Sequence, residues 1–185
     1  MSGVEERHYG TAELEAGLDH VRDAPADAGR LELVVRRPVE GEREELDTGE
    51  LDLTEGLVGD RWSRGKHGRP PKSNESQLTL MSARAADLVA GTRERWPLAG
   101  DQLFVDIDLS EENLPPGTRL AVGAAVVEIS ALPHTGCKKF VERFGKEAML
   151  FVNSPEGRAL RLRGVNARIV EPGAVRPGDE IRKLT

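Results

Sequence analysis

Hydrophobic positions repeat with two different periods along this chain. Near the N-terminus they return every three or four residues, which predicts a helix over residues 11–23. Its apolar face holds Leu14, Leu18 and Val21. After a linker at residues 24–29 the period shortens to two, which is typical of strands that bury one face. We therefore expect the rest of the chain to be rich in β-structure.

The predicted strands are short and are separated by turn residues. Leu103, Val105 and Ile107 give the clearest alternation, and Gly123 is expected to bend or bulge a longer strand. The predicted strands cover residues 31–36, 51–53, 78–80, 103–110, 120–130, 165–169 and 180–184. About seven or eight such strands predict a mainly β fold, a closed or nearly closed β-barrel.

Short helices are predicted between these strands. Ser82 can cap the first of them and Gly91 can end it, while Gly145 is expected to break the second. The predicted helices cover residues 83–90, 138–151 and 154–164. We divide the chain into an N-terminal helix and linker at residues 1–30 and a barrel domain, decorated by these helices, at residues 31–185.

Composition narrows the class of protein. The 185 residues, 38% hydrophobic and 31% charged, suit one globular domain with an aliphatic core. No apolar run approaches the roughly 18 residues that a membrane helix needs, and the N-terminus lacks the apolar stretch of a secretory signal. A single cysteine excludes an internal disulfide and an iron–sulfur cluster held by four cysteines of this chain. We expect a cytoplasmic protein with no membrane partner.

Charge is distributed unevenly along the chain, whose net charge is −6. Residues 40–55 hold eight acidic residues and one basic residue, Arg43. Residues 61–72 hold no acidic residue and five basic ones, Arg61, Arg64, Lys66, Arg69 and Lys72. Such a loop is often merely solvated, but in an acidic chain it also suits an anionic ligand. The acidic balance and the few aromatic residues argue against nucleic acid as a partner.

The only cysteine, Cys137, carries the strongest chemical signal. It follows a predicted strand and precedes a predicted helix, whose dipole favours a thiolate. Lys138, Lys139 and His134 favour the thiolate in the same way, and Gly136 lets the backbone approach a ligand closely. A thiolate attacks electrophiles or coordinates a soft metal. A buried structural cysteine and a Cys–His hydrolase are the alternatives that these residues leave open.

Several segments, in order, resemble the MOSC domain family, named for the C-terminal domain of molybdenum cofactor sulfurase. Residues 134–138, His-Thr-Gly-Cys-Lys, resemble its cysteine motif, and residues 56–61 resemble its glycine–aspartate–arginine segment. Residues 110–114 resemble its glutamate–asparagine–leucine segment. Further likeness lies in residues 66–68, 77–80, 116–117, 164–170 and 175–181. The resemblance covers most of the chain, from residue 31 to residue 184.

The resemblance implies a barrel that binds the molybdenum cofactor, a metal held by the dithiolene of a phosphorylated pterin. Cys137 matches the family cysteine, which carries sulfur or ligates molybdenum, so it is the predicted catalytic residue and metal ligand. The basic loop suits the phosphate, and the amides of Gln77 and Asn113 suit the pterin edge. The implied cofactor-binding residues are Arg61, Lys66, His67, Gln77, Glu112, Asn113, His134, Gly136 and Lys138.

At two positions this sequence differs from the family members that are reductases. Family members that reduce N-hydroxylated compounds usually have proline before the cysteine, where this chain has Gly136. They also commonly carry paired histidines where this chain has Trp62 and Ser63. The chain is too short for the pyridoxal phosphate-dependent desulfurase domain of the full sulfurases and for a flavin domain. We therefore expect a stand-alone module that works with a small-molecule substrate and a separate electron-donor or sulfur-donor protein.

Three functions remain open at this point. The chain can be a molybdenum-dependent reductase or sulfurase-like enzyme, a non-catalytic carrier of sulfur or cofactor, or a barrel without cofactor that binds a partner protein. We predict that Cys137 is partly accessible at the mouth of the barrel. We also predict that the loop at residues 59–72 borders the same pocket.

Overall fold

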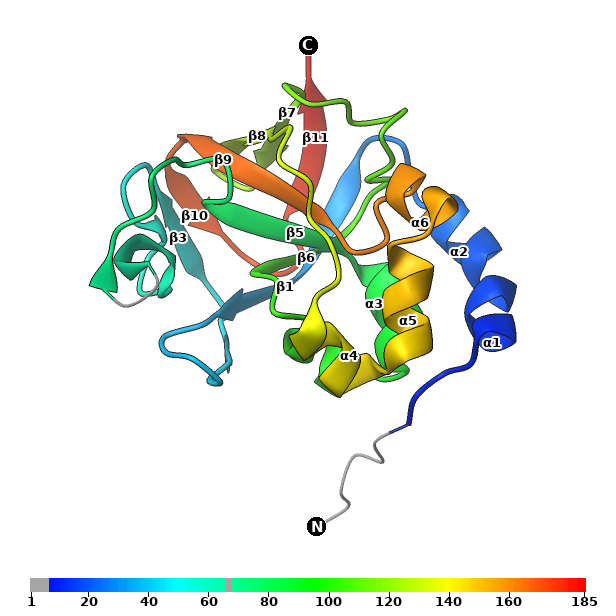
Figure 1. The fold of residues 1–185 in the computed structure, drawn as a ribbon. Coiled ribbons are helices and arrows are strands. Elements are labelled where there is room, and N and C mark those ends of the chain that lie inside the picture. Colours follow the sequence, from blue (N-terminus) through cyan, green and yellow to red (C-terminus); the bar gives the residue numbers. More distant parts are fainter. Residues whose placement is uncertain (1–6, 66–67) are drawn as a thin grey trace.

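The computed structural model describes residues 7–65 and 68–185, and seven of their strands close into a β-barrel (Figure 1). Around the barrel the order is β1, β6, β5, β9, β8, β7 and β11, and β11 pairs with β1 to close it. β5 and β6 are parallel and the other neighbours are antiparallel. These strands are β1 (Gly29–Arg36), β5 (Leu78–Ser82), β6 (Leu103–Asp106), β7 (Arg119–Val122), β8 (Ala125–Ile129), β9 (Val165–Glu171) and β11 (Glu180–Leu184). The predicted mainly β barrel is confirmed.

Four further strands lie beside the barrel. β2 (Glu44–Glu45) pairs antiparallel with the end of β1. A separate small sheet is formed by β10 (Gly173–Val175), β3 (Gly49–Asp52) and β4 (Gly56–Leu57).

The helices gather on one side of the barrel (Figure 1). They are α1 (Thr11–Ala16), α2 (Leu18–Arg22), α3 (Ala83–Ala90), α4 (Lys138–Phe144), α5 (Lys146–Val152) and α6 (Pro155–Ala159), with 3₁₀ turns η1 (Trp62–Arg64) and η3 (Arg93–Ala99). The Ser82 hydroxyl caps α3 by accepting from the Ala85 N–H at 3.2 Å, and Gly91 ends it at φ 77°, as predicted. Within the described chain, no helix is long and apolar enough to cross a membrane.

Two predicted elements are each divided in the structure. The helix over residues 11–23 is interrupted at Gly17, which separates α1 from α2. The strand over residues 120–130 is a hairpin, because Gly123 turns the chain at φ 54° rather than bulging it. A Cβ at Gly123 would lie 2.3 Å from the Asp179 carboxylate, so the turn needs glycine. The strand predicted to end at residue 110 ends at Asp106.

Hydrophobic residues form two cores, one inside the barrel and one between the barrel and the helices. β1 contributes to both, and a register shift between Leu31 and Leu33 places these two residues on opposite faces of the strand. Leu31 and Val34 face the barrel interior, whereas Leu33 and Val35 pack beneath the helices. The second core holds the helices that carry the candidate site against the barrel.

Candidate functional site

Cys137 lies at the start of α4 with an exposed side chain, which confirms that it is accessible. Its backbone is extended, at φ −128°, so Cys137 is the N-cap and the helix begins at Lys138. The residue lines a cavity of about 130 Å³. Six basic residues line the same cavity, namely Arg37, Arg43, Arg61, Lys139, Arg143 and Arg163.

The peptide before Cys137 is held by Asn153 at the end of α5. The Gly136 N–H donates to Asn153 Oδ1 at 2.9 Å, and Asn153 Nδ2 donates to the Gly136 carbonyl at 3.3 Å. A Cβ at Gly136 would lie 3.2 Å from Asn153 Nδ2, so glycine fits here closely. The proline common in the family's reductases would lack the N–H that Asn153 accepts.

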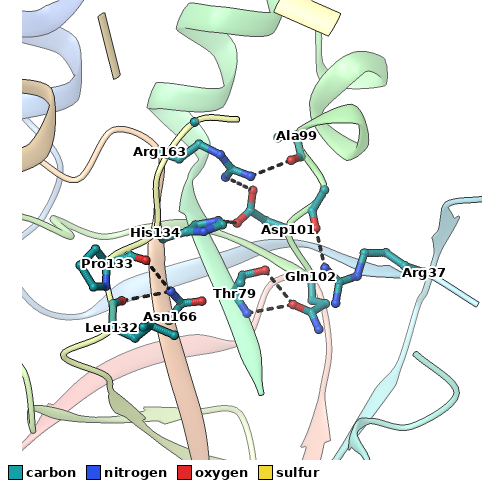
Figure 2. A network of polar contacts seen from close by, with 12 residues as sticks. Arg37, Thr79, Ala99, Asp101, Gln102, Leu132, Pro133, His134, Arg163 and Asn166 are labelled. Atoms are coloured by element: carbon teal, nitrogen blue, oxygen red, sulfur yellow. Dashed lines mark hydrogen bonds and ion pairs between the residues drawn. The ribbon is translucent and has the colours of Figure 1, made fainter. Parts of the chain in front are cut away.

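A buried carboxylate, Asp101, ties the Cys137 loop to the rim of the barrel (Figure 2). Asp101 is fully buried and accepts from His134 Nε2 at 2.9 Å and from Arg163 Nη1 at 2.6 Å. Burial acts to raise the pKa of Asp101, but the charges of Arg163 and His134 outweigh it and lower the pKa to about 2. Because an ionised carboxylate only accepts hydrogen bonds, the proton lies on Nε2 of His134. No hydrogen bond joins His134 to Cys137 among the described residues, so the Cys–His hydrolase interpretation has no support in the geometry.

A second buried carboxylate, Asp60, positions the basic loop. It accepts from Arg37 Nε at 2.9 Å and Nη2 at 2.8 Å, and from the backbone N–H of Arg37 and Trp62. Burial acts to raise the pKa of Asp60, but the hydrogen bonds and charge of Arg37 lower it below 3.8 overall. The aspartate of the glycine–aspartate–arginine segment therefore has a structural role, and it places Arg61 at the cavity.

A larger cavity of about 830 Å³ adjoins the first and shares Arg37, Arg61 and Lys139 with it. The basic loop contributes Arg64 and Arg69. Other lining residues are Pro38, Val39, Glu40, Trp62, Gly65, Pro71 and Ser76. The indole Nε1 of Trp62 is buried and has no hydrogen-bond partner in the described part of the chain. Three of the loop's basic residues, Arg61, Arg64 and Arg69, thus border the cavity pair that includes Cys137, while Lys66 and His67 lie outside the described residues.

A family model, the MOSC domain, matches residues 67–182, well over half of the chain.

This chain belongs to the MOSC domain family.

Solved structures share its fold. The YuaD protein from Bacillus subtilis is 19% identical with a TM-score of 0.57, over 84% of this chain and 95% of that one. YiiM from Escherichia coli is 21% identical with a TM-score of 0.55, over 84% of this chain and 70% of that one. A structure described as a hypothetical protein is 19% identical with a TM-score of 0.56, over 90% of this chain and 71% of that one. No curated protein sequence matches the chain.

The two amides predicted for the pterin edge are engaged elsewhere in this MOSC domain. Gln77 is fully buried, where Nε2 donates to the Leu53 carbonyl at 2.8 Å and Oε1 accepts from the Ile169 N–H at 2.8 Å. Asn113 Nδ2 donates to backbone carbonyls, at 2.7 Å to that of Asp108. Its Oδ1 accepts from Lys183 Nζ at 2.9 Å. Both side chains hold segments of the fold together and line neither cavity.

Of the remaining predicted residues, Glu112 and Lys138 are exposed, and neither lines the two cavities. His134 and Gly136 belong to the loop that carries Cys137, but their described contacts go to Asp101 and Asn153. They position the cysteine rather than line its cavity.

Several site residues are absent from the sequence-based prediction. They are Arg37, Arg43, Asp101, Arg143, Asn153 and Arg163. Only Arg43 carried a usable signal, because it is the one basic residue in the acidic stretch at residues 40–55. Arg37, Arg43 and Arg61 also lie outside the segment that the family model matches.

Proposed function

We propose that this MOSC domain binds the molybdenum cofactor with its phosphorylated pterin in the larger basic cavity and with the Cys137 thiol, from the adjoining small cavity, directed toward the metal. One observation carries the proposal. The only cysteine is exposed in a cavity rich in guanidinium groups, and that cavity opens into one large enough for a phosphorylated pterin.

The residues present fit such a group in charge and in donor chemistry. Arg64 and Arg69 in the larger cavity suit a phosphate, since guanidinium groups bind phosphate oxygens in a bidentate manner. The unpartnered Nε1 of Trp62 offers a further donor there. No three His, Cys, Asp or Glu side chains of the described residues gather into a metal site. Cys137 would thus be the soft protein donor to a metal whose other ligands come with the cofactor.

The protein's own contribution is to hold the cofactor and to orient the Cys137 thiol. When bound, the molybdenum centre would supply two-electron redox chemistry. Asn153 fixes the peptide before Cys137, and Asp101 ties His134 of the same loop to Arg163, which precedes β9. These contacts preorganise the thiol, which lowers the cost of placing it against a ligand.

The reaction that we propose is reduction of an N-hydroxylated small molecule. The N–O bond is cleaved with two electrons from a separate electron-donor protein. One proton converts the departing hydroxide to water, and a second proton is taken up by the nitrogen. The exposure of Cys137 also favours a second candidate, a sulfur carrier, because a partner protein can reach the thiol. A carrier would hold labelled sulfur on Cys137 without turnover.

The test is analysis of molybdenum and pterin in protein made by a host that synthesises the cofactor. We expect near-stoichiometric molybdenum in the wild type and almost no molybdenum in Cys137→Ser. A serine hydroxyl is a harder and far less acidic ligand than the thiol, although it is similar in size. We also expect the double variant Arg64→Gln/Arg69→Gln to lose most of its pterin, because both side chains are exposed and face the larger cavity.

Arg119→Gln is the matched control, since Arg119 is an exposed arginine on β7 that pairs with Glu128 away from both cavities. It should retain the cofactor. Folded wild-type protein without molybdenum or pterin would refute the proposal. Full activity in folded Cys137→Ser would remove Cys137 from the mechanism.

A further inference from the structure

Positive charge in the small cavity beside Cys137 is only partly neutralised. Three of its six basic side chains have carboxylate partners: Arg37 pairs with Asp60, Arg163 with Asp101 and Lys139 with Glu40. The other three, Arg43, Arg61 and Arg143, have no carboxylate partner among the described residues. About three positive charges are therefore left facing a small volume in a protein whose net charge is −6.

Two of these guanidinium groups converge on one point. From a Cβ placed on Gly100, Arg43 Nη2 would lie 3.6 Å away and Arg143 Nη1 3.8 Å away. Both are held by backbone carbonyls at the end of η3: Arg43 Nε donates to Pro97 at 3.0 Å and Arg143 Nη1 donates to Leu98 at 2.6 Å. These carbonyls fix the two side chains in place without neutralising their charge.

The electrostatic cost of this arrangement is visible at Arg43. Burial lowers the pKa of Arg43 from 12.5, and the charges of Arg143, Arg37 and Arg61 lower it further, to about 10. Burying like charges together is unfavourable unless an anion binds among them.

The size of the cavity limits that anion. The cavity has a volume of about 130 Å³, against about 830 Å³ for the larger cavity beside it. A tetrahedral or planar oxyanion fits, whereas a pterin phosphate with its ring system needs the larger cavity. Arg64 and Arg69 line the larger cavity only, and Arg43 and Arg143 line the smaller cavity only.

We infer that the small cavity is a binding site for a small oxyanion or for the carboxylate of a small substrate, held by Arg43, Arg61 and Arg143 beside Cys137. The inference goes beyond the proposed function and relies on it only in assigning the larger cavity to the cofactor phosphate. It also gives the substrate a charge, because a site of this kind favours anionic molecules over cationic ones. Substrates that are cationic at neutral pH are thereby disfavoured.

The decisive experiment is calorimetric titration of cofactor-free protein with sodium sulfate against sodium chloride at matched ionic strength. We expect saturable binding of one sulfate by the wild type. In the same protein, sulfate should slow alkylation of Cys137 by neutral iodoacetamide several-fold, since the anion lies in the same cavity. Arg43→Gln and Arg143→Gln should each weaken sulfate binding about tenfold, as expected for loss of a charged hydrogen bond of about 1.4 kcal/mol.

Arg119→Gln should bind sulfate like the wild type, and circular dichroism should show each variant folded. Where Arg43→Gln fails to fold, Arg143→Gln decides, because the Arg143 side chain donates to one carbonyl, that of Leu98, whereas the Arg43 side chain donates to two. Equal sulfate affinity in folded Arg143→Gln and wild type would overturn the inference, and so would the absence of sulfate binding.

A second arm separates this site from the cofactor phosphate. Cofactor-loaded protein should still bind sulfate, and Arg43→Gln should retain wild-type molybdenum content. Loss of sulfate binding on loading would show that the cofactor phosphate occupies the small cavity, which contradicts the inference. A wild type that never retains molybdenum would refute the proposed function alone, since the titration of cofactor-free protein would still decide the anion site.

Discussion

Asn153 holds the Gly136 peptide as a neighbouring strand would, with one donor and one acceptor. The pair of hydrogen bonds fixes both the N–H and the carbonyl of the residue before Cys137. The thiol itself stays exposed, so its accessibility and its fixed position come from different groups. At the scale of residues, this side chain is the one most directly responsible for where Cys137 lies.

Replacement of Asn153 should loosen the loop that carries Cys137. Asn153→Ala loses both hydrogen bonds and leaves the Gly136 peptide without its partner, which should cost about 1–3 kcal/mol of unfolding free energy. Urea denaturation measures this loss, and hydrogen exchange should show faster opening at Gly136 and Cys137 than in the barrel strands. Asn153→Asp keeps the acceptor for the Gly136 N–H, so its unfolding free energy should lie between those of the wild type and Asn153→Ala. Unchanged exchange at Gly136 in Asn153→Ala would show that the loop is held by other contacts.

Residue types in the sequence indicated the right chemistry more often than the right place. The basic loop and Cys137 were predicted to share a pocket, and Arg61 does line the cavity of Cys137. Gln77 and Asn113 have the donors and acceptors that a pterin needs, but the barrel uses them to bind its own backbone. A sequence shows that an amide is present and cannot show which internal groups compete for it.

At the scale of elements, the ends of three segments meet at one buried carboxylate. Asp101 precedes β6, Arg163 precedes β9, and His134 lies in the loop between β8 and α4 (Figure 2). Arg163 Nη2 also donates to the Ala99 carbonyl at 2.9 Å, at the end of η3. The contacts therefore join the loop of Cys137 to strands that are far apart in sequence.

The Asp101 carboxylate should make the free energy of unfolding fall at acidic pH. The pKa of Asp101 is lowered from 3.8 to about 2, so the folded state favours the ionised form. The resulting stabilisation, of roughly 2 kcal/mol, is present above pH 4 and is lost as the pH falls toward 2. Asp101→Asn should lower the unfolding free energy at pH 7 by about 3–5 kcal/mol, because Arg163 stays buried without its partner. Its stability should also fall less between pH 4 and pH 2 than that of the wild type.

Denaturant unfolding at pH 7, 4 and 3 measures both effects. Glu128→Gln is the comparison, since Glu128 pairs with Arg119 and Arg168 on the barrel surface and should lose no more than about 1 kcal/mol. Parallel pH profiles for Asp101→Asn and the wild type would contradict the assignment of the pH dependence to Asp101.

Element boundaries were predictable where one local interaction decides them. Ser82 and Gly91 bound α3 as predicted, and Gly145, at φ 92°, separates α4 from α5. Gly17 and Gly123 also mark breaks, but the sequence did not show that each divides an element in two. The groups that would crowd a side chain at Gly123, the Asp179 carboxylate and the Ala174 carbonyl, are distant in sequence and become neighbours only in the fold.

At the scale of the whole molecule, the N-terminal helices and the barrel share one core. Leu14, Leu18 and Val21 are buried in the same cluster as Leu33 of β1 and Phe140 of α4. Thus the layer that supports the cysteine helix is completed by the first helices of the chain. The sequence predicted the apolar face of the N-terminal helix but not the surface it covers, because the shift in β1 that turns Leu33 outward has no local signal.

The core shared by the helices and the barrel should make the molecule unfold as one unit. Leu14 is fully buried, so Leu14→Ala should lower the unfolding free energy by about 2–5 kcal/mol through lost burial and an unfilled cavity. Because the helices and the barrel share the core, the variant should still unfold in a single transition, with fluorescence and circular dichroism giving the same midpoint. Leu132→Ala is the control, since Leu132 is 42% exposed and its loss should change stability by less than about 0.5 kcal/mol. Two separate transitions would instead show that residues 1–30 and the barrel are independent units. In that case the N-terminal helices could not be what keeps α4, and with it Cys137, in place.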